Sequence, residues 1–184
     1  MYDTKGITMK RTLALCYVIL TFSLILPAFS FSADLKGETA VFNELRSVIP
    51  KDKIKNVDDL YGKWKEIQGD KSEAIIIDVR TEAEFDAGHI INSSNVDSGH
   101  AYGLRKKIED ASSEIWIICR TQHRASYFVG LLYKYGYTNV YLAEGGIKGW
   151  AEKGYPLINK YLGVINVTKY QNQAEEDFLF RENK

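Results

Sequence analysis

The chain has 184 residues, of which 45% are hydrophobic and 26% are charged. This composition excludes a disordered or collagen-like chain, and the length fits one domain with extensions. Lysine plus arginine and aspartate plus glutamate both number 24, so the chain lacks the net positive charge that draws proteins to nucleic acid. We therefore expect no nucleic-acid partner.

Residues 1–33 have the order of a secretory signal peptide behind a short extension. Lys10 and Arg11 precede an apolar run from Leu13 to Leu26, and small residues follow it up to Ala33. The run is shorter than the roughly 20 residues that span a bilayer, which favours a cleavable signal over a retained anchor. We expect an exported, periplasmic protein that touches a membrane only through an uncleaved signal.

The two cysteines lie in very different surroundings. Cys16 is inside the apolar run and would leave with the signal, so Cys119 would be the sole cysteine of the mature chain. An internal disulfide is then impossible, and an unpaired cysteine in an oxidising compartment suggests a reactive thiol. One cysteine and scattered histidines lack the spacing of metal ligands, so we expect no metal and no other cofactor.

Two helices are expected ahead of the first buried strand. Residues 34–55 form a helical lead-in, with apolar residues at helical spacing and Pro50 as the stop. The second helix begins at Asn56 or Val57, because acidic residues occupy its first turn, where the helix dipole favours negative charge. Its end is marked by Gly69.

Short runs of β-branched residues predict strands. Residues 74–77 lead into Asp78 and residues 114–118 lead into Cys119, and both runs have the continuous apolar form of strands buried on both faces of a parallel sheet. A further strand is expected at 140–142 and a small one within 90–96.

Helices are expected between these strands, at 82–87, 102–111, 125–135 and after Gly145 and Gly146. The alternation predicts an α/β domain over residues 56–158, with a central, mostly parallel sheet flanked by helices on both faces. Residues 159–184 form a polar C-terminal extension.

Three motifs, in the same order, resemble those of the rhodanese superfamily. The run from Ile77 to Ile90 reads IDVRTEAEFDAGHI and resembles the first signature. The run from Cys119 to Ser126 reads CRTQHRAS and resembles the active-site loop, and the run from Leu142 to Trp150 reads LAEGGIKGW and resembles the closing motif. The likeness implies a single rhodanese-like domain whose cysteine loop leads from a strand to a helix.

The resemblance also implies a sulfurtransferase activity. Sulfane sulfur would move from thiosulfate, another small anionic donor or a persulfide to a thiol or cyanide acceptor, with Cys119 as nucleophile and persulfide carrier. A partner protein that accepts the persulfide is a further option. A persulfide carrier without turnover, or a redox-sensing binding module, stays open as an alternative.

The residues after Cys119 suit this chemistry. A thiolate is the nucleophile, and a following helix N-terminus together with nearby arginines lowers the pKa of a thiol. Backbone N–H groups around the sulfur would form a bowl that binds an anionic donor. The residues expected to bind substrate are Arg120, Thr121, Gln122, His123, Arg124 and Ala125.

Three of these residues have a second interpretation. Arg124 orients the oxygens of the donor or pairs with a nearby carboxylate, and His123 contacts substrate or is solvated. Gln122 stands where the family pattern has glycine, so it would be strained if the position needs a positive φ. Asp78, Arg80 and His89 are expected to brace the domain and not to react.

The spacing of the loop bears on a rival enzymatic function. The rival is a cysteine phosphatase or an arsenate reductase. Four residues separate Cys119 from Arg124, whereas cysteine phosphatases and their rhodanese-related relatives place five there. The shorter loop makes a smaller bowl, which favours transfer of a sulfur atom over hydrolysis of a phosphate ester.

Overall fold

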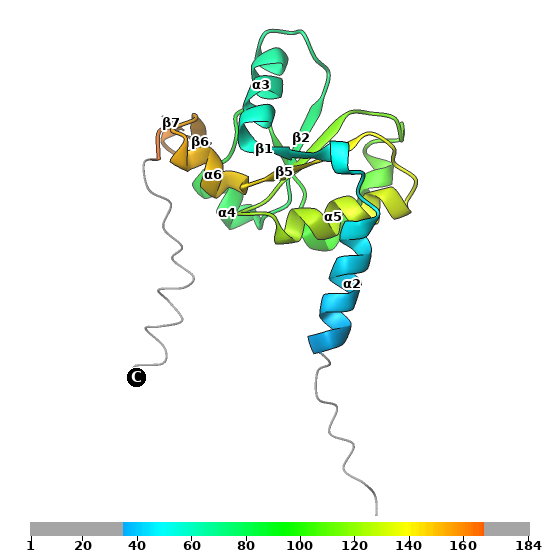
Figure 1. The fold of residues 1–184 in the computed structure, drawn as a ribbon. Coiled ribbons are helices and arrows are strands. Elements are labelled where there is room, and N and C mark those ends of the chain that lie inside the picture. The colour runs from blue at the N-terminus through cyan, green and yellow to red at the C-terminus, as the bar shows by residue number, and fades with distance from the viewer. Residues whose placement is uncertain (1–34, 168–184) are drawn as a thin grey trace, which may run out of the picture. The chain divides into compact units, whose positions relative to one another are not determined.

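The computed structural model describes residues 35–167 (Figure 1). The predicted signal segment with Cys16 and the last part of the predicted C-terminal extension lie outside the described residues. Among the helices of residues 35–167, none is long and apolar enough to cross a membrane.

Five parallel strands form the central sheet, in the order β1-β5-β4-β2-β3. The strands are β1 (Ile54–Asn56), β2 (Ile75–Asp78), β3 (Ser94–Asn95), β4 (Ile115–Ile118) and β5 (Val140–Glu144). The predicted α/β architecture is confirmed, and β1 adds an edge strand that was not expected within the lead-in. A separate antiparallel pair consists of β6 (Leu157–Asn159) and β7 (Gly163–Ile165).

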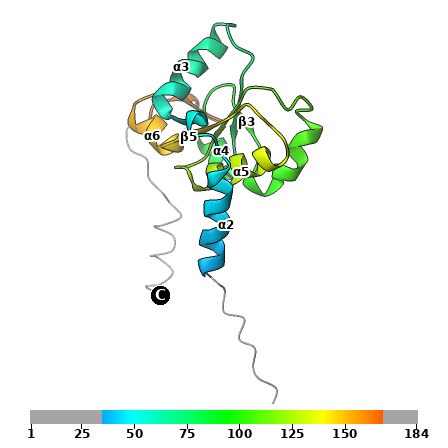
Figure 2. The same cartoon turned by 45° about the vertical axis from the view of Figure 1, so that its right-hand side comes forward.

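Alternate residues of the central strands point to opposite faces of the sheet, and each face is covered by helices. Ile76, Trp116 and Ile118 belong to one buried cluster with residues of α3 (Val57–Gln68) and α6 (Gly146–Glu152). Ile77, Ile115 and Ile117 belong to the other, with α5 (His123–Lys134) and the 3₁₀ segment η2 (Ser98–Lys106). Figures 1 and 2 show α3 and α5 on opposite sides of the sheet. The apolar runs of the sequence therefore become strands buried on both faces.

Side-chain caps set the start of two helices. The Asn56 side chain accepts hydrogen bonds from the backbone N–H groups of Asp58 and Asp59, so α3 begins at Val57 as predicted. Helix α4 (Glu82–Ala87) begins after Thr81, whose hydroxyl accepts from the Glu84 N–H while the Glu84 carboxylate accepts from the Thr81 N–H. Each reciprocal pair satisfies N–H groups that a helix start leaves without partners.

The prediction of a helix over 102–111 is wrong at both ends. The Asp97 side chain accepts from the Gly99 N–H, so the helical segment η2 starts earlier, at Ser98. It stops at Lys106, and Asp110 further on accepts from the backbone N–H and the hydroxyl of Ser112. Such a local turn competes with helix for the same backbone groups.

Helix α2 (Leu35–Ser47) is longer than the short helix expected in the lead-in, and it packs against α5. A Cβ atom added to Gly130 of α5 would lie 2.4 Å from the backbone oxygen of Leu45. The two backbones therefore touch directly. Arg46 of α2 donates a hydrogen bond of 2.8 Å to the Ser126 hydroxyl and pairs with Glu144 at the end of β5.

Candidate active site

Cys119 directly follows β4, the middle strand of the sheet. Because all five strands are parallel, their carboxyl ends meet at one edge, where binding sites of α/β sheets form. Asp78 ends β2 opposite Ile118, and Glu144 ends β5 on the other side of β4. The cysteine therefore lies between two neighbouring strand ends, and its loop leads from β4 to the helix α5, His123–Lys134, as the family resemblance implied.

The first residues of α6 donate backbone hydrogen bonds to the loop that begins at Cys119. The Ile147 N–H donates to the Cys119 carbonyl at 2.9 Å, and the Lys148 N–H donates to the Arg120 carbonyl at 3.0 Å. Gly146 has a φ of +61°, and a Cβ there would lie 2.4 Å from the Arg120 oxygen. Only glycine fits this position, because any side chain would meet the loop backbone.

The Cys119 sulfur accepts hydrogen bonds from the backbone N–H groups of Ala125 and Thr121. Cys119 is only 1% exposed, and burial raises the pKa of its thiol more than these N–H groups and the charge of Arg124 lower it. The charge of Asp78 raises the same pKa slightly further. The predicted lowering of this pKa is therefore wrong: Cys119 rests as a thiol that must lose its proton before it attacks.

A small cavity of about 200 Å³ opens above the sulfur. It is lined by Cys119, Arg120, Thr121, His123 and Arg124. Of the other two residues predicted to bind substrate, Ala125 is buried and contributes its backbone N–H, whereas Gln122 is not among the lining residues.

Gln122 does not have the positive φ that would favour glycine. Its φ is −163°. The replacement of the family's glycine therefore does not distort the loop. The following helix α5 begins at His123 instead of the predicted Ala125, so its first free N–H groups come closer to the sulfur.

Arg124 is engaged by a carboxylate from another helix. Its guanidinium donates to both oxygens of Glu84, at 2.6 and 2.8 Å. This bidentate pair lowers the pKa of Glu84 to about 2 and raises that of Arg124. The predicted alternative for Arg124, pairing with a carboxylate, is thus realised, and its charge still acts on Cys119.

A buried ion pair lies at the end of the neighbouring strand β2. Asp78 and Arg80 are 0% and 2% exposed, and their closest atoms are 2.7 Å apart. Arg80 also donates to the Gly88 carbonyl at 2.7 Å, and His89 Nδ1 lies 2.8 Å from the Phe85 carbonyl. The Arg80 contacts tie the end of β2 to the end of α4, in keeping with the bracing role expected of Asp78 and Arg80, whereas the His89 contact stays at the end of α4.

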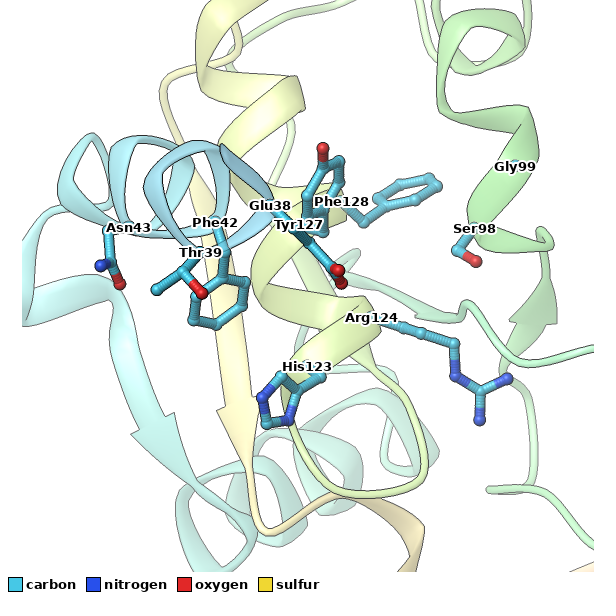
Figure 3. Close-up of a pocket in the computed structure, with 10 residues that line it drawn as sticks. All are labelled: Glu38, Thr39, Phe42, Asn43, Ser98, Gly99, His123, Arg124, Tyr127 and Phe128. Atoms are coloured by element: carbon cyan, nitrogen blue, oxygen red, sulfur yellow. The ribbon is translucent and has the colours of Figure 1, made fainter. Parts of the chain in front are cut away.

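A second, larger cavity of about 640 Å³ lies beside the small one, between α2, η2 and α5 (Figure 3). The Phe42 ring of α2 stacks on His123, with ring centroids 5.2 Å apart. The lining residues are Glu38, Thr39, Phe42, Asn43, Ser98, Gly99, His123, Arg124, Tyr127 and Phe128. The sequence pattern had given no site role to α2, because Phe42 and Arg46 carry no motif.

Comparisons with known proteins agree with this geometry. A family model described as a rhodanese-like domain matches residues 61–153. A protein named sulfurtransferase from Allochromatium vinosum is 28% identical over 89 residues, which cover 48% of this chain and 82% of that protein. The thiosulfate sulfurtransferase GlpE of Pseudomonas putida is 29% identical over 84 residues, covering 44% of this chain and 72% of the relative.

The fold also matches solved structures. The polysulfide-sulfur transferase homodimer from Wolinella succinogenes has a TM-score of 0.53 and 23% sequence identity, and the match covers 69% of this chain and 90% of that one. At this identity the likeness concerns the fold. The matched family range begins after α2, so the larger cavity takes one of its walls from outside that range.

Proposed function

Because this chain belongs to the rhodanese-like domain family, we propose that it is an exported sulfurtransferase that carries sulfane sulfur as a persulfide on Cys119. The family relationship supports the general type of reaction. Export, in our proposal to a periplasm, is supported by the basic, apolar and small-residue order of residues 1–33.

The observation that carries the proposal is the environment of the Cys119 sulfur. Two backbone N–H groups, from Thr121 and Ala125, donate to it at the floor of the cavity of about 200 Å³. Donors held in place before the reaction stabilise negative charge as it forms on sulfur. The same site suits the thiolate before attack and the persulfide after it.

The proposed reaction has two steps, formation of the Cys119 persulfide and transfer of its outer sulfur to the acceptor. Cys119 gives its proton to solvent, and the thiolate attacks the outer sulfur of the donor. The sulfur–sulfur bond of the donor breaks, sulfite leaves thiosulfate with the electron pair, and Cys119 becomes a persulfide. A thiol or cyanide acceptor then takes the outer sulfur, and the electron pair returns to Cys119 as thiolate.

The Glu84–Arg124 pair bears on which donor is used. A dianionic donor such as thiosulfate must compete with the Glu84 carboxylate for the guanidinium, which Glu84 already contacts through both oxygens. A persulfide donor carries less negative charge and depends less on Arg124. The pair therefore favours persulfide donors over thiosulfate within our proposal.

Mass spectrometry of the purified protein tests the proposal. After incubation with thiosulfate or with glutathione persulfide, we expect a one-sulfur adduct on the wild type that cyanide removes. Cys119→Ala is the matched control and should form no cyanide-labile adduct. Hydrolysis of p-nitrophenyl phosphate in the absence of any adduct would instead support a phosphatase, and a stable adduct without turnover would support a carrier.

A further inference from the structure

The cavity between α2, η2 and α5 is too large and too apolar for the small donors of the proposed reaction. Its volume of about 640 Å³ compares with about 200 Å³ for the hollow above Cys119. Pockets for drug-sized organic ligands span roughly 300–1,000 Å³. Figure 3 shows the Phe42, Tyr127 and Phe128 rings at this cavity, contributed by two helices.

The two cavities are adjacent, because they share lining residues. His123 and Arg124 line both of them. The Phe42 ring stacks on His123, whereas Figure 3 shows the Arg124 side chain extending away from that stack. A molecule lying in the larger cavity would therefore border the hollow that holds the Cys119 sulfur.

The charges around the larger cavity indicate a neutral occupant. Glu38 lines it with a carboxylate, and the positive charge of Arg124 is balanced by Glu84. An anionic group would meet negative charge there, whereas an aromatic or branched apolar group would pack against rings. Tyr127 is 39% exposed, so a bound apolar body would cover aromatic surface that water now reaches.

We propose that this cavity binds the body of a neutral thiol acceptor that carries an aromatic or bulky apolar group, and places its sulfur at the Cys119 persulfide. The inference rests on the proposed sulfurtransferase function and names its acceptor class. The acceptor thiol gives its proton to solvent, and its thiolate attacks the outer sulfur of the persulfide and forms a new sulfur–sulfur bond. The bond between that outer sulfur and the Cys119 sulfur breaks, and its electron pair stays on Cys119, which becomes a thiolate.

Single-turnover transfer tests the inference. The full-length protein is loaded with persulfide, and mass spectrometry follows its loss to 2-phenylethanethiol or to 2-mercaptoethanol. The measured quantity is the ratio of the two second-order rate constants. We expect Phe42→Ala and Tyr127→Ala each to lower this ratio about tenfold, which corresponds to about 1.4 kcal/mol of binding in the transition state.

Val41→Ala is the matched control, because Val41 lies on α2, is 43% exposed and does not line the cavity. It should leave the ratio as in the wild type. A ratio that changes less than twofold in both Phe42→Ala and Tyr127→Ala would overturn the acceptor inference alone, because persulfide loading is measured separately. Absence of any persulfide on the wild type would overturn the proposed function and this inference with it.

Discussion

The ion pair between Glu84 and Arg124 offers the sharpest test of the site's electrostatics. Glu84→Gln removes the negative charge while the amide oxygen still accepts from the Thr81 N–H, so the cap of α4 is kept. Arg124 then keeps at most one acceptor of the two at 2.6 and 2.8 Å, because the other oxygen becomes an NH2 group, and it loses the charge of its partner. The variant therefore isolates the charge pair from the start of the helix.

The pKa shift of Glu84 and the exposure of the two side chains set the expected loss of stability in Glu84→Gln. The pKa of Glu84 falls from its usual 4.5 to about 2, a difference that would correspond to about 3 kcal/mol for a fully buried pair. The Glu84 and Arg124 side chains are 30% and 34% exposed, so solvent screening reduces the contribution to about 1 to 1.5 kcal/mol. Because the folded-state pKa is lowered, this stabilisation is complete above pH 4.5 and is lost as the pH falls toward 2.

Urea unfolding at several pH values measures this contribution. We expect Glu84→Gln to be less stable than the wild type by about 1 to 1.5 kcal/mol at pH 7, and the difference to shrink below pH 4.5 and vanish as the pH falls toward 2. Glu82→Gln is the matched control, since Glu82 lies on the same helix and is exposed. Equal stability of Glu84→Gln and the wild type at pH 7, or a difference that does not shrink in acid, would refute the reasoning.

Two substitutions probe the backbone contacts, and the pH dependence of alkylation probes the thiol. Gly146→Ala places a Cβ at a φ of +61° against the loop backbone, so we expect a loss of more than about 1 kcal/mol in urea unfolding and a tenfold or greater slowing of persulfide formation. Gly130→Ala would push the Leu45 carbonyl away from α5 and should cost about 2 kcal/mol in the same unfolding assay; unchanged stability would argue against the contact. Because burial raises the pKa of Cys119, its alkylation by iodoacetamide should reach half its maximal rate at a higher pH than that of a small free thiol, and a midpoint below that of the free thiol would contradict this account.

The sheet and the position of Cys119 were predictable because each depends on local pattern. The buried strands are short apolar runs, and each is followed at once by a chemically distinct residue, Asp78 or Cys119. Parallel strands bring such residues to one edge whatever the details of packing. The start of α3 was equally readable, since its cap consists of neighbouring residues.

Contacts between distant segments could not be predicted in the same way. Glu84 and Arg124 are 40 residues apart, and Arg46 and Ser126 are 80 apart. The sequence pattern around Thr81 and Glu84 predicts only the helix cap that they form with each other. Nothing in the sequence indicates that Glu84 also pairs with Arg124. The pKa of Cys119 was misjudged for a related reason: the charges were visible in the sequence, but the burial that outweighs them depends on the folded surroundings.

The contact at Gly130 means that the position of α2 on α5 and the lining of the larger cavity depend on different atoms of α2. Each can therefore be changed separately. Helix α2 meets α5 there through the Leu45 main-chain oxygen, and an oxygen of the main chain is present whatever amino acid occupies the position. The cavity-facing side chains of α2, among them Glu38 and Phe42, contribute nothing to that contact. If the larger cavity binds the acceptor as proposed, substitutions at its α2 positions would change the choice of acceptor while this main-chain contact still holds α2 on α5.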